Sequence, residues 1–450
     1  MLKGIVLLLT FSFALTNGSV SVHNPFYCYA DDPIKPQHGM FSTTSAYETT
    51  RGDSVDAGVS SCTPSKFWLI TRHGTRLPSL SDLTLIFRHN ENLHSDIVRN
   101  FESGRTSLCA SDINLIKEWK FDPNITFENE QFLTVSGWNE ARQVAERYQS
   151  AFPSLLPSTY SRDTYFFRST ATQRTIGTLH AFADGLFGFN GHEQVEFEDI
   201  AQPDVLLRPY QFCPLYDEIA NIRAEQNAFV EGPEYQEMIV QVSQKLGFHG
   251  SHVLRAEEIQ TLSILCRFEQ IWDMNATSPL CAAFSIANFQ VMEYWSDLYY
   301  YYRWGYGQRN YRRLFENLPC HLIQDMLHFI RSEDANDNRV RIFGAHLPSL
   351  YLTLVSFGAF DGDAPLNRHN FAQQTFRMWK SSNITPMAAN LAVIRYDCED
   401  GDNDVLFLHN EKPLQIPGCQ PNGLCKQSFL LEKFSRFLDI NCSNLYCTNA

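Results

Sequence analysis

The sequence has little positive charge, no internal repeat and no low-complexity segment. Its 450 residues carry 36 Lys and Arg against 50 Asp and Glu, a formal net charge of −14. Nucleic acids and anionic membrane surfaces are bound through extended basic surfaces, so this balance argues against both classes of partner. Any anionic ligand must be bound by a local basic pocket. With 44% hydrophobic and 13% aromatic residues, the chain falls outside the disordered and fibrous classes.

Long apolar runs are also scarce, since no stretch reaches the roughly 18 uninterrupted apolar residues that indicate a membrane span. The N-terminus reads Met1, Leu2 and Lys3, then an apolar run over 4–15 and small or polar residues at 16–19. This pattern is typical of a secretory signal peptide, and we expect residues 1–18 to be removed. The C-terminus shows neither an ER-retention signal nor a GPI signal. The mature protein is therefore predicted to be secreted and soluble, with no membrane association.

Histidines at zinc-finger spacing are lacking beside the close cysteine pairs, which makes a metal site the weaker interpretation. Twelve cysteines in an exported chain predict up to six disulfides instead. Asn-X-Thr triplets at Asn124, Asn275 and Asn383 are predicted glycosylation acceptors, and Asn441 begins a poorer one.

Hydrophobic periodicity predicts an α/β fold. Short apolar runs indicate buried strands. Apolar residues that recur every three and four positions, after Pro233 and over 322–330, indicate helices. No linker is evident, and roughly 185–319 reads as a mostly helical insert. We therefore expect a doubly wound, mostly parallel sheet formed by 19–184 and 320–450, interrupted by an α-helical cap at 185–319, with a disulfide-rich C-terminal tail. The predicted strands are 67–71, 164–167, 340–343 and an antiparallel pair, 391–396 and 405–408.

Basic side chains follow three of these strands. Arg72 and His73 follow the first, Arg168 the second and His346 the third. Ligands of open α/β sheets bind at the carboxyl ends of the strands. Arginine forks beside an imidazole can hold phosphate oxygens, and Gly74 allows close backbone approach.

The segment Arg72-His73-Gly74-Thr75-Arg76-Leu77-Pro78 resembles the Arg-His-Gly-Thr-Arg-x-Pro signature of the histidine acid phosphatase and phytase branch of the histidine phosphatase superfamily. Further similar segments are Phe167-Arg168-Ser169-Thr170 with Arg174, Cys266 and Cys281 about Asn275, Gly305-Tyr306-Gly307, and Cys320 with Asp325. Together they are most similar to the multiple inositol polyphosphate phosphatases, from about Cys62 to Lys412.

This resemblance implies a phosphomonoesterase without metal or cofactor that acts on inositol polyphosphates or similar small phosphate esters. His73 would attack phosphorus and form a phosphohistidine, which water then hydrolyses. Arg72, Arg76, Arg168 and His346 would hold the phosphate oxygens, and Thr75 would help to bind substrate. Two alternatives stay open: Arg168 could be a helix-terminal residue without a ligand, and His346 could be a core histidine. The aromatic run 299–304 is expected to pack rather than to stack on a sugar.

The chain departs from the family at the proton donor. The family has a glutamate two residues after the histidine that matches His346, but this chain has Pro348 there, and no Asp or Glu occurs in 340–360. Asp361 or Asp363 could replace it, the enzyme could be weakened, or the chain could bind phosphorylated small molecules without hydrolysing them. Leu77, where these relatives tend to carry an aromatic residue, bears on substrate fit.

Short disulfide loops are the ones that can be proposed. We expect Cys266–Cys281, Cys419–Cys425 and Cys442–Cys447. The partners of the other half-cystines cannot be deduced from the sequence. These are Cys28, Cys62, Cys109, Cys213, Cys320 and Cys398.

Overall fold

The computed structural model describes residues 21–55, 59, 61–219, 222–362, 364–399 and 401–450. The predicted signal peptide and Asp363 lie outside these ranges. Among the described residues, no helix is both long and apolar enough to cross a membrane.

A seven-stranded sheet, in the order β2-β3-β1-β4-β5-β6 with β7 beside β5, forms the centre of the molecule. β1, β2 and β3 are parallel, whereas β4 to β7 are joined in antiparallel pairs. The α/β class is confirmed, as is the antiparallel pair β4 and β5, but the sheet is mixed rather than mostly parallel. The strands are β1 (Cys62–Arg72), β2 (Tyr165–Ser169), β3 (Val340–Ala345), β4 (Asn390–Cys398), β5 (Asp404–His409), β6 (Lys412–Pro413) and β7 (Leu424–Lys426).

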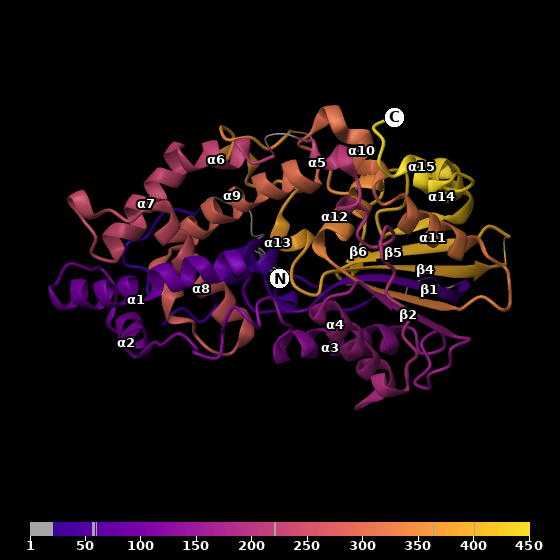
Figure 1. Cartoon of the computed structure of the whole chain (residues 1–450), viewed down its shortest axis with the longest axis horizontal. Helices are drawn as coiled ribbons and strands as arrows, with labels where there is room; N and C mark the ends of the chain where they lie inside the picture. The colour runs from indigo at the N-terminus through magenta and orange to yellow at the C-terminus, as the bar shows by residue number, and fades with distance from the viewer. Residues whose placement is uncertain (1–20, 56–58, 60, 220–221, 363, 400) are drawn as a thin grey trace, which may run out of the picture.

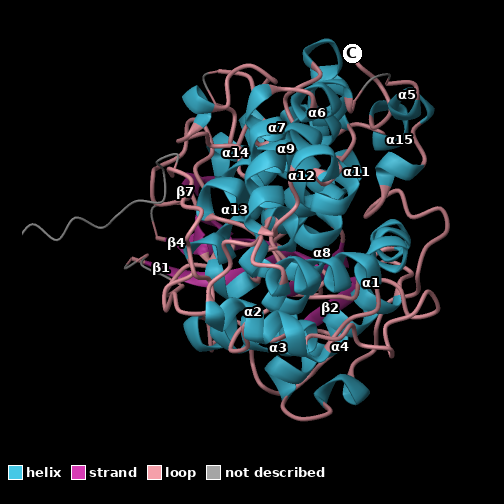
Figure 2. Ribbon diagram, turned by 90° about the vertical axis from the view of Figure 1, so that its left-hand side faces the viewer, coloured by secondary structure: helices cyan, strands magenta, loops and turns pink. Residues whose placement is uncertain are grey.

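Helices cover both faces of the sheet and form a second region beside it. In Figure 1, α3 and α4 lie below the strands and α11 and α12 above them, while α1, α2 and α6 to α9 extend to the left. Figure 2 looks at the left-hand side of that view, so the helices that extend to the left in Figure 1 lie in front of the strands. The helices are α1 (Leu80–Glu102), α2 (Ala110–Glu118), α3 (Val135–Ala151), α4 (Gln173–Phe187), α5 (Pro214–Asp217), α6 (Ala224–Val230), α7 (Pro233–Lys245), α8 (Ala256–Trp272), α9 (Ile286–Trp304), α10 (Arg312–Asn317), α11 (Cys320–Arg331), α12 (Leu347–Ser356), α13 (Ser381–Ile384), α14 (Gln427–Lys433) and α15 (Cys442–Leu445).

The helical periodicities of the sequence correspond to α7 and α11, and the described residues between β2 and β3 contain no strand. α1, from an earlier part of the chain, packs against α8 and so extends the helical region. The domain division at 184 and 185 falls inside α4 and stays a prediction.

β1 is the central strand because both of its faces are apolar. Phe67 and Leu69 belong to the core on the α3 and α4 side, and Trp68 and Ile70 to the core on the α11 and α12 side. Side chains of a strand alternate between faces, so a continuous apolar run is buried on both sides. This burial fixes the end of β1, where Arg72 is the last residue and His73 follows it.

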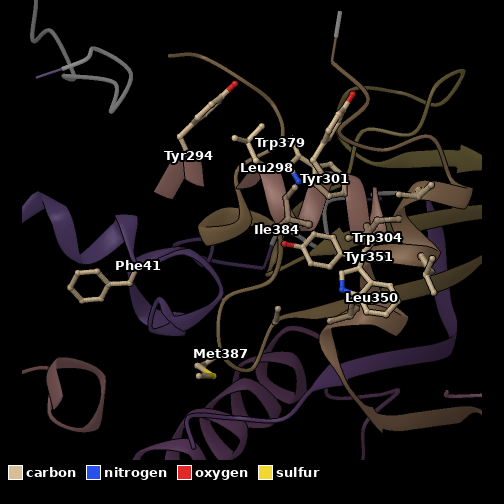
Figure 3. Packing of buried hydrophobic residues seen from close by; sticks show 14 of the residues in the cluster. Phe41, Tyr294, Leu298, Tyr301, Trp304, Leu350, Tyr351, Trp379, Ile384 and Met387 are labelled. Atoms are coloured by element: carbon tan, nitrogen blue, oxygen red, sulfur yellow. The ribbon is translucent and has the colours of Figure 1, made fainter. Parts of the chain in front are cut away.

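An aromatic cluster fixes α12 against α9 (Figure 3). The Tyr351 ring of α12 stacks on Trp379 with centroids 5.2 Å apart, and Trp379 also meets Tyr301 of α9 at 5.6 Å. Tyr301 and Trp304 are buried, as the packing interpretation of this run predicts. Because α12 begins directly after His346, this cluster also positions that histidine.

Six disulfides join the cysteines of the chain, as the sequence predicted. Cys266–Cys281 and Cys419–Cys425 are confirmed, whereas the predicted Cys442–Cys447 pair is wrong. Two cysteines five positions apart across a helical turn point in different directions, and α15 occupies this segment. The other pairs are Cys28–Cys109, Cys62–Cys398, Cys213–Cys447 and Cys320–Cys442. The predicted glycosylation acceptors Asn124, Asn275 and Asn383 are exposed, and their modification stays a prediction.

Candidate active site

Arg72, the last residue of β1, is buried with its charge fixed by backbone carbonyls. One guanidinium nitrogen donates to the carbonyls of Thr43 and Thr385, each at 2.6 Å. Its Nε is buried without a hydrogen-bond partner among the described residues. Burial, and then the charge of Arg76, lower the pKa of Arg72 to about 9. The hydrogen bonds of Arg72 thus hold its guanidinium in place. They go to neutral carbonyl groups and not to a carboxylate, so the positive charge is kept.

The His73 ring has one nitrogen fixed and the other free. Nδ1 lies 2.9 Å from the carbonyl oxygen of Gly74. A carbonyl can only accept, so Nδ1 carries the proton and Nε2 of the neutral ring keeps a lone pair. Burial, and then the charges of Arg72, Arg174 and Arg76, lower the pKa of His73 well below its usual range. His73 is therefore a buried, neutral imidazole whose Nε2 lone pair is not used by a hydrogen bond among the described residues.

His346 lies beside His73 because β3 is the parallel neighbour of β1. The His73 amide donates to the carbonyl of Ala345 at 3.2 Å, and the two imidazole centroids are 5.8 Å apart. Nε2 of His346 is 2.9 Å from the Thr170 hydroxyl. Burial, followed by the charges of Arg174 and Arg208, lowers the pKa of His346 well below its usual range. The structure thus brings together the two histidines that the sequence singled out.

The loop after His73 is held against α3. A Cβ on Gly74 would lie 2.3 Å from the Gly137 carbonyl oxygen, so the close backbone approach expected at Gly74 is confirmed. The Thr75 amide and hydroxyl donate to the two carboxylate oxygens of Glu140, at 2.7 and 2.9 Å. Thr75, which the sequence predicted to bind substrate, is fully buried on this contact. We therefore assign Thr75 to holding the loop in place.

Arg168 lies short of the edge at which the sequence placed it. Arg168 of β2 pairs with Phe343 of β3, and Phe343 pairs with Ile70 of β1. Arg168 is therefore at the level of Ile70, which lies two residues before Arg72. At about 3.3 Å per residue, that puts it about 7 Å before the end of β1. Its guanidinium donates to the Asp204 carboxylate at 2.9 Å. Arg168 is thus engaged in a salt bridge with a buried carboxylate.

Arg174, in the first turn of α4, supplies the charge that Arg168 was expected to supply. Its positive charge acts on both His73 and His346, and its Nε is buried without a partner among the described residues. Burial and the charge of Arg76 lower the pKa of Arg174 to about 10. Arg208, also near His346, has a similarly unpartnered Nε. Arg174 belongs to the sequence pattern around Phe167. Its position at the start of a helix is the signal in the sequence that could identify it as an anion-binding residue.

Among the described residues, the predicted proton donor Asp361 does not lie near His346. Pro348 occupies the first turn of α12, which contains no acidic residue. Asp361 comes after the far end of this ten-residue helix, about 15 Å along its axis, and is ion-paired with Arg312 at 3.0 Å. Asp361 is therefore in the wrong place for a proton donor to an ester at His73. Asp363 lies outside the described residues.

A cleft of about 540 Å³ opens beside Arg76 and is lined mostly by α1, α6, α8 and α9. The Arg76 guanidinium lies 5.6 Å from the Phe268 ring centroid. Arg223 and Arg267 also line the cleft, together with one carboxylate, Asp82. Its other large side chains are Trp295, Met292, Tyr299 and Tyr300.

A neutral, buried imidazole among arginines at the ends of parallel strands is a site for attack on a phosphate group, so fold and site define a phosphate-processing α/β protein. Residues 66–410 match the family described as histidine phosphatase superfamily (branch 2). The chain belongs to this family and is a phosphatase of the histidine acid phosphatase and phytase type, a phosphoric monoester hydrolase.

Two curated relatives have the same name, multiple inositol polyphosphate phosphatase 1. The chain is 36% identical to the protein of Drosophila melanogaster over 95% of this chain and 91% of that one. It is 27% identical to the protein of Homo sapiens over 79% and 76%, respectively.

Solved structures show the same fold at low sequence identity. The phytase from D. castellii superposes with a TM-score of 0.71 at 16% identity, covering 96% of this chain and 94% of that one. The multiple inositol polyphosphate phosphatase of Bifidobacterium longum, in complex with inositol hexasulfate, gives 0.63 at 15% identity, covering 87% and 96%.

Proposed function

We propose that this protein is a secreted phosphomonoesterase that hydrolyses inositol polyphosphates, or related small phosphate esters, through a phosphohistidine at His73. The observation that carries the proposal is the His73 ring: Nδ1 is held by the Gly74 carbonyl, Nε2 is free, and Arg72, Arg76 and Arg174 act on it. Two curated relatives, from Drosophila melanogaster and Homo sapiens, carry the name of an inositol polyphosphate phosphatase.

In the first step, Nε2 of His73 forms a bond to phosphorus while the bond from phosphorus to the alcohol oxygen breaks. In the second step, water attacks phosphorus, the P–N bond breaks, and inorganic phosphate leaves. Arg72, Arg76 and Arg174, with His346, stabilise the charge on the equatorial oxygens during both steps. Arg168 acts indirectly in this scheme, through Asp204.

The cleft beside Arg76 supports a substrate with several phosphates. Arg223 is exposed at the cleft, and Arg267 is half-buried. These two cations can bind phosphates that are not being cleaved. We also propose that residues 185–319 act as a cap over the reacting phosphate, because α6, α8 and α9 contribute most of these lining residues.

Secretion is supported by the six disulfides, which are typical of secreted or lumenal proteins. The N-terminal pattern of the sequence points to the same compartment.

The direct test is release of inorganic phosphate from phytate by the purified protein between about pH 3 and pH 8. His73→Ala should abolish release, and base-quenched wild-type enzyme should carry a phosphate on a peptide containing His73. An inactive wild-type protein across this range would overturn the proposal.

A second candidate function is favoured by one observation, the absence of an acid in the first turn of α12. The protein would then capture phosphorylated small molecules without hydrolysing them. In calorimetric titrations with phytate, such a protein would retain binding in His73→Ala better than in Arg72→Ala. Absence of heat with the wild-type protein would exclude this candidate.

A further inference from the structure

The proposed function assigns no proton donor to the departing alcohol, and the carboxylates around the site are the candidates for this role. Three of them are already engaged. Both oxygens of Glu140 accept from Thr75, Asp204 is ion-paired with Arg168, and Asp82 accepts from the amide and hydroxyl of its own helix cap. These three carboxylates are held by Thr75, by Arg168 or by a helix cap, and are not directed at a departing ester oxygen.

Glu130 precedes a segment that is fixed against the phosphate-binding loop. The Gln131 amide donates to the Pro78 carbonyl at 3.0 Å, and the Leu77 amide donates to the Phe132 carbonyl at 2.9 Å. A bridge also links Leu133 to Arg76. The loop that carries Arg76 is thus paired with the residues directly after Glu130.

The same segment is fixed to the start of α4, which carries Arg174. The Leu133 amide donates to the Gln173 side-chain oxygen at 2.8 Å. Gln131 adopts φ +58°, in the left-handed region, which is a strained conformation for a residue with a side chain. The chain therefore reverses direction directly after Glu130, between the two loops that carry Arg76 and Arg174.

The Glu130 carboxylate is close enough to both arginines to act on their charges. It raises the pKa of Arg76 and of Arg174 against the larger effect of burial. Its side chain is half-buried, and the side-chain amide of Gln131 donates to it over a long distance, 3.4 Å. Unlike the other three carboxylates, Glu130 is not occupied by a short hydrogen bond or an ion pair among the described residues.

We propose that Glu130 is the general acid of this phosphatase, in place of the carboxyl that the first turn of α12 lacks. This inference rests on the proposed function. As Nε2 of His73 bonds to phosphorus and the ester P–O bond breaks, the Glu130 carboxyl transfers its proton to the departing oxygen, and a neutral alcohol leaves. In the second step, the Glu130 carboxylate takes a proton from the attacking water while the P–N bond breaks.

The test compares two esters that differ in their need for a proton: glycerol 2-phosphate, whose alkoxide leaves poorly, and p-nitrophenyl phosphate, whose phenolate leaves readily. Glu130→Gln should lower kcat/KM for the glycerol ester by about 100-fold or more, and for the aryl ester by about threefold at most. It should also remove the loss of activity that deprotonation of the acid causes on the alkaline side of the glycerol-ester profile.

The matched control is Glu128→Gln, which changes an exposed carboxylate in the same loop and should leave both rates unchanged. Inorganic phosphate should inhibit Glu130→Gln at least as strongly as the wild type, because a negative charge near Arg76 and Arg174 is lost, which shows that the variant is folded and its arginines are in place. If Glu130→Gln misfolds, Glu130→Asp is used instead. It should also lower kcat/KM more for the glycerol ester than for the aryl ester.

Equal losses on the two esters, or no loss on either, would overturn the assignment of Glu130 and leave the proposed function intact. A wild-type protein that hydrolyses neither ester nor phytate would overturn the proposed function, and the role of Glu130 with it.

Discussion

Arg168 and Arg174 are close in sequence but make different contacts. Arg168 is ion-paired with Asp204, which is almost fully buried, whereas the charge of Arg174 acts on both imidazoles. A residue that binds the transition state affects rate, while a residue that pairs a buried charge affects mainly stability.

We therefore predict opposite effects of removing these arginines. Arg174→Ala should lower kcat/KM for phytate by about 100-fold or more and change the melting temperature little. Arg168→Ala should lower the free energy of unfolding by about 3 kcal/mol, because Asp204 loses its partner, with a smaller effect on rate. Phosphate release and thermal unfolding of the two variants check this. A larger rate loss in Arg168→Ala would restore the role first predicted for it.

Glu140 gives the stability of the protein a pH dependence. Burial raises the pKa of Glu140 from its usual 4.5 to about 7, although Thr75 and Arg72 oppose the shift. The folded state then binds this proton more tightly than the unfolded state, so the free energy of unfolding should fall as pH rises from 4.5 to 7. At 1.36 kcal/mol per pKa unit, the fall is about 3 kcal/mol at most.

Glu140→Gln should remove this pH dependence. Because glutamine does not titrate, we expect the stability deficit of the variant to be largest near pH 5 and to shrink towards pH 8. Urea unfolding at the two pH values measures it, with the exposed Glu91→Gln as control. Parallel stability curves for wild type and Glu140→Gln would contradict the prediction.

At the scale of elements, the strands were predictable because β1, β3, β4 and β5 each contain a short apolar run. Their pairing was less accessible. The sequence does not report register, and it is register that sets Arg168 below the sheet edge. The contacts of Glu140 and Glu130 were also out of reach, because loop segments far apart in sequence must first be folded together.

α12 offers a way to restore the missing acid. Its first turn contains Leu347 and Pro348, and a carboxylate there is favoured by the helix dipole. In the Glu130→Gln background, which has lost its proposed acid, Leu347→Ala with Pro348→Glu should raise the turnover of alkyl phosphates by more than that of p-nitrophenyl phosphate. General acid catalysis typically contributes about 10²- to 10⁴-fold, which bounds the gain. Equal gains on both esters would mean that proton donation does not limit this enzyme.

At the scale of the whole molecule, the C-terminal segment carries one long-range disulfide and one local disulfide. Cys213–Cys447 closes a separation of 234 residues, and Cys419–Cys425 closes one of 6. In the chain-entropy model these loops contribute about 5 and about 2 kcal/mol.

Serine replacement of both cysteines in each pair should therefore have unequal effects. We expect Cys213→Ser with Cys447→Ser to lower the thermal midpoint clearly more than Cys419→Ser with Cys425→Ser. Scanning calorimetry at one pH checks the order. Equal shifts would mean that strain or residual structure, rather than loop length, decides the contribution of each bridge.

The Cys213–Cys447 bridge also sets a schedule for biosynthesis. During translation, Cys213 emerges long before Cys447, and Cys266 and Cys281 emerge in between with each other as partners. A thiol that waits this long is open to mispairing, so maturation should depend on an oxidoreductase that can undo wrong bridges. Yield in a bacterial host should accordingly rise when such an isomerase is supplied in the periplasm.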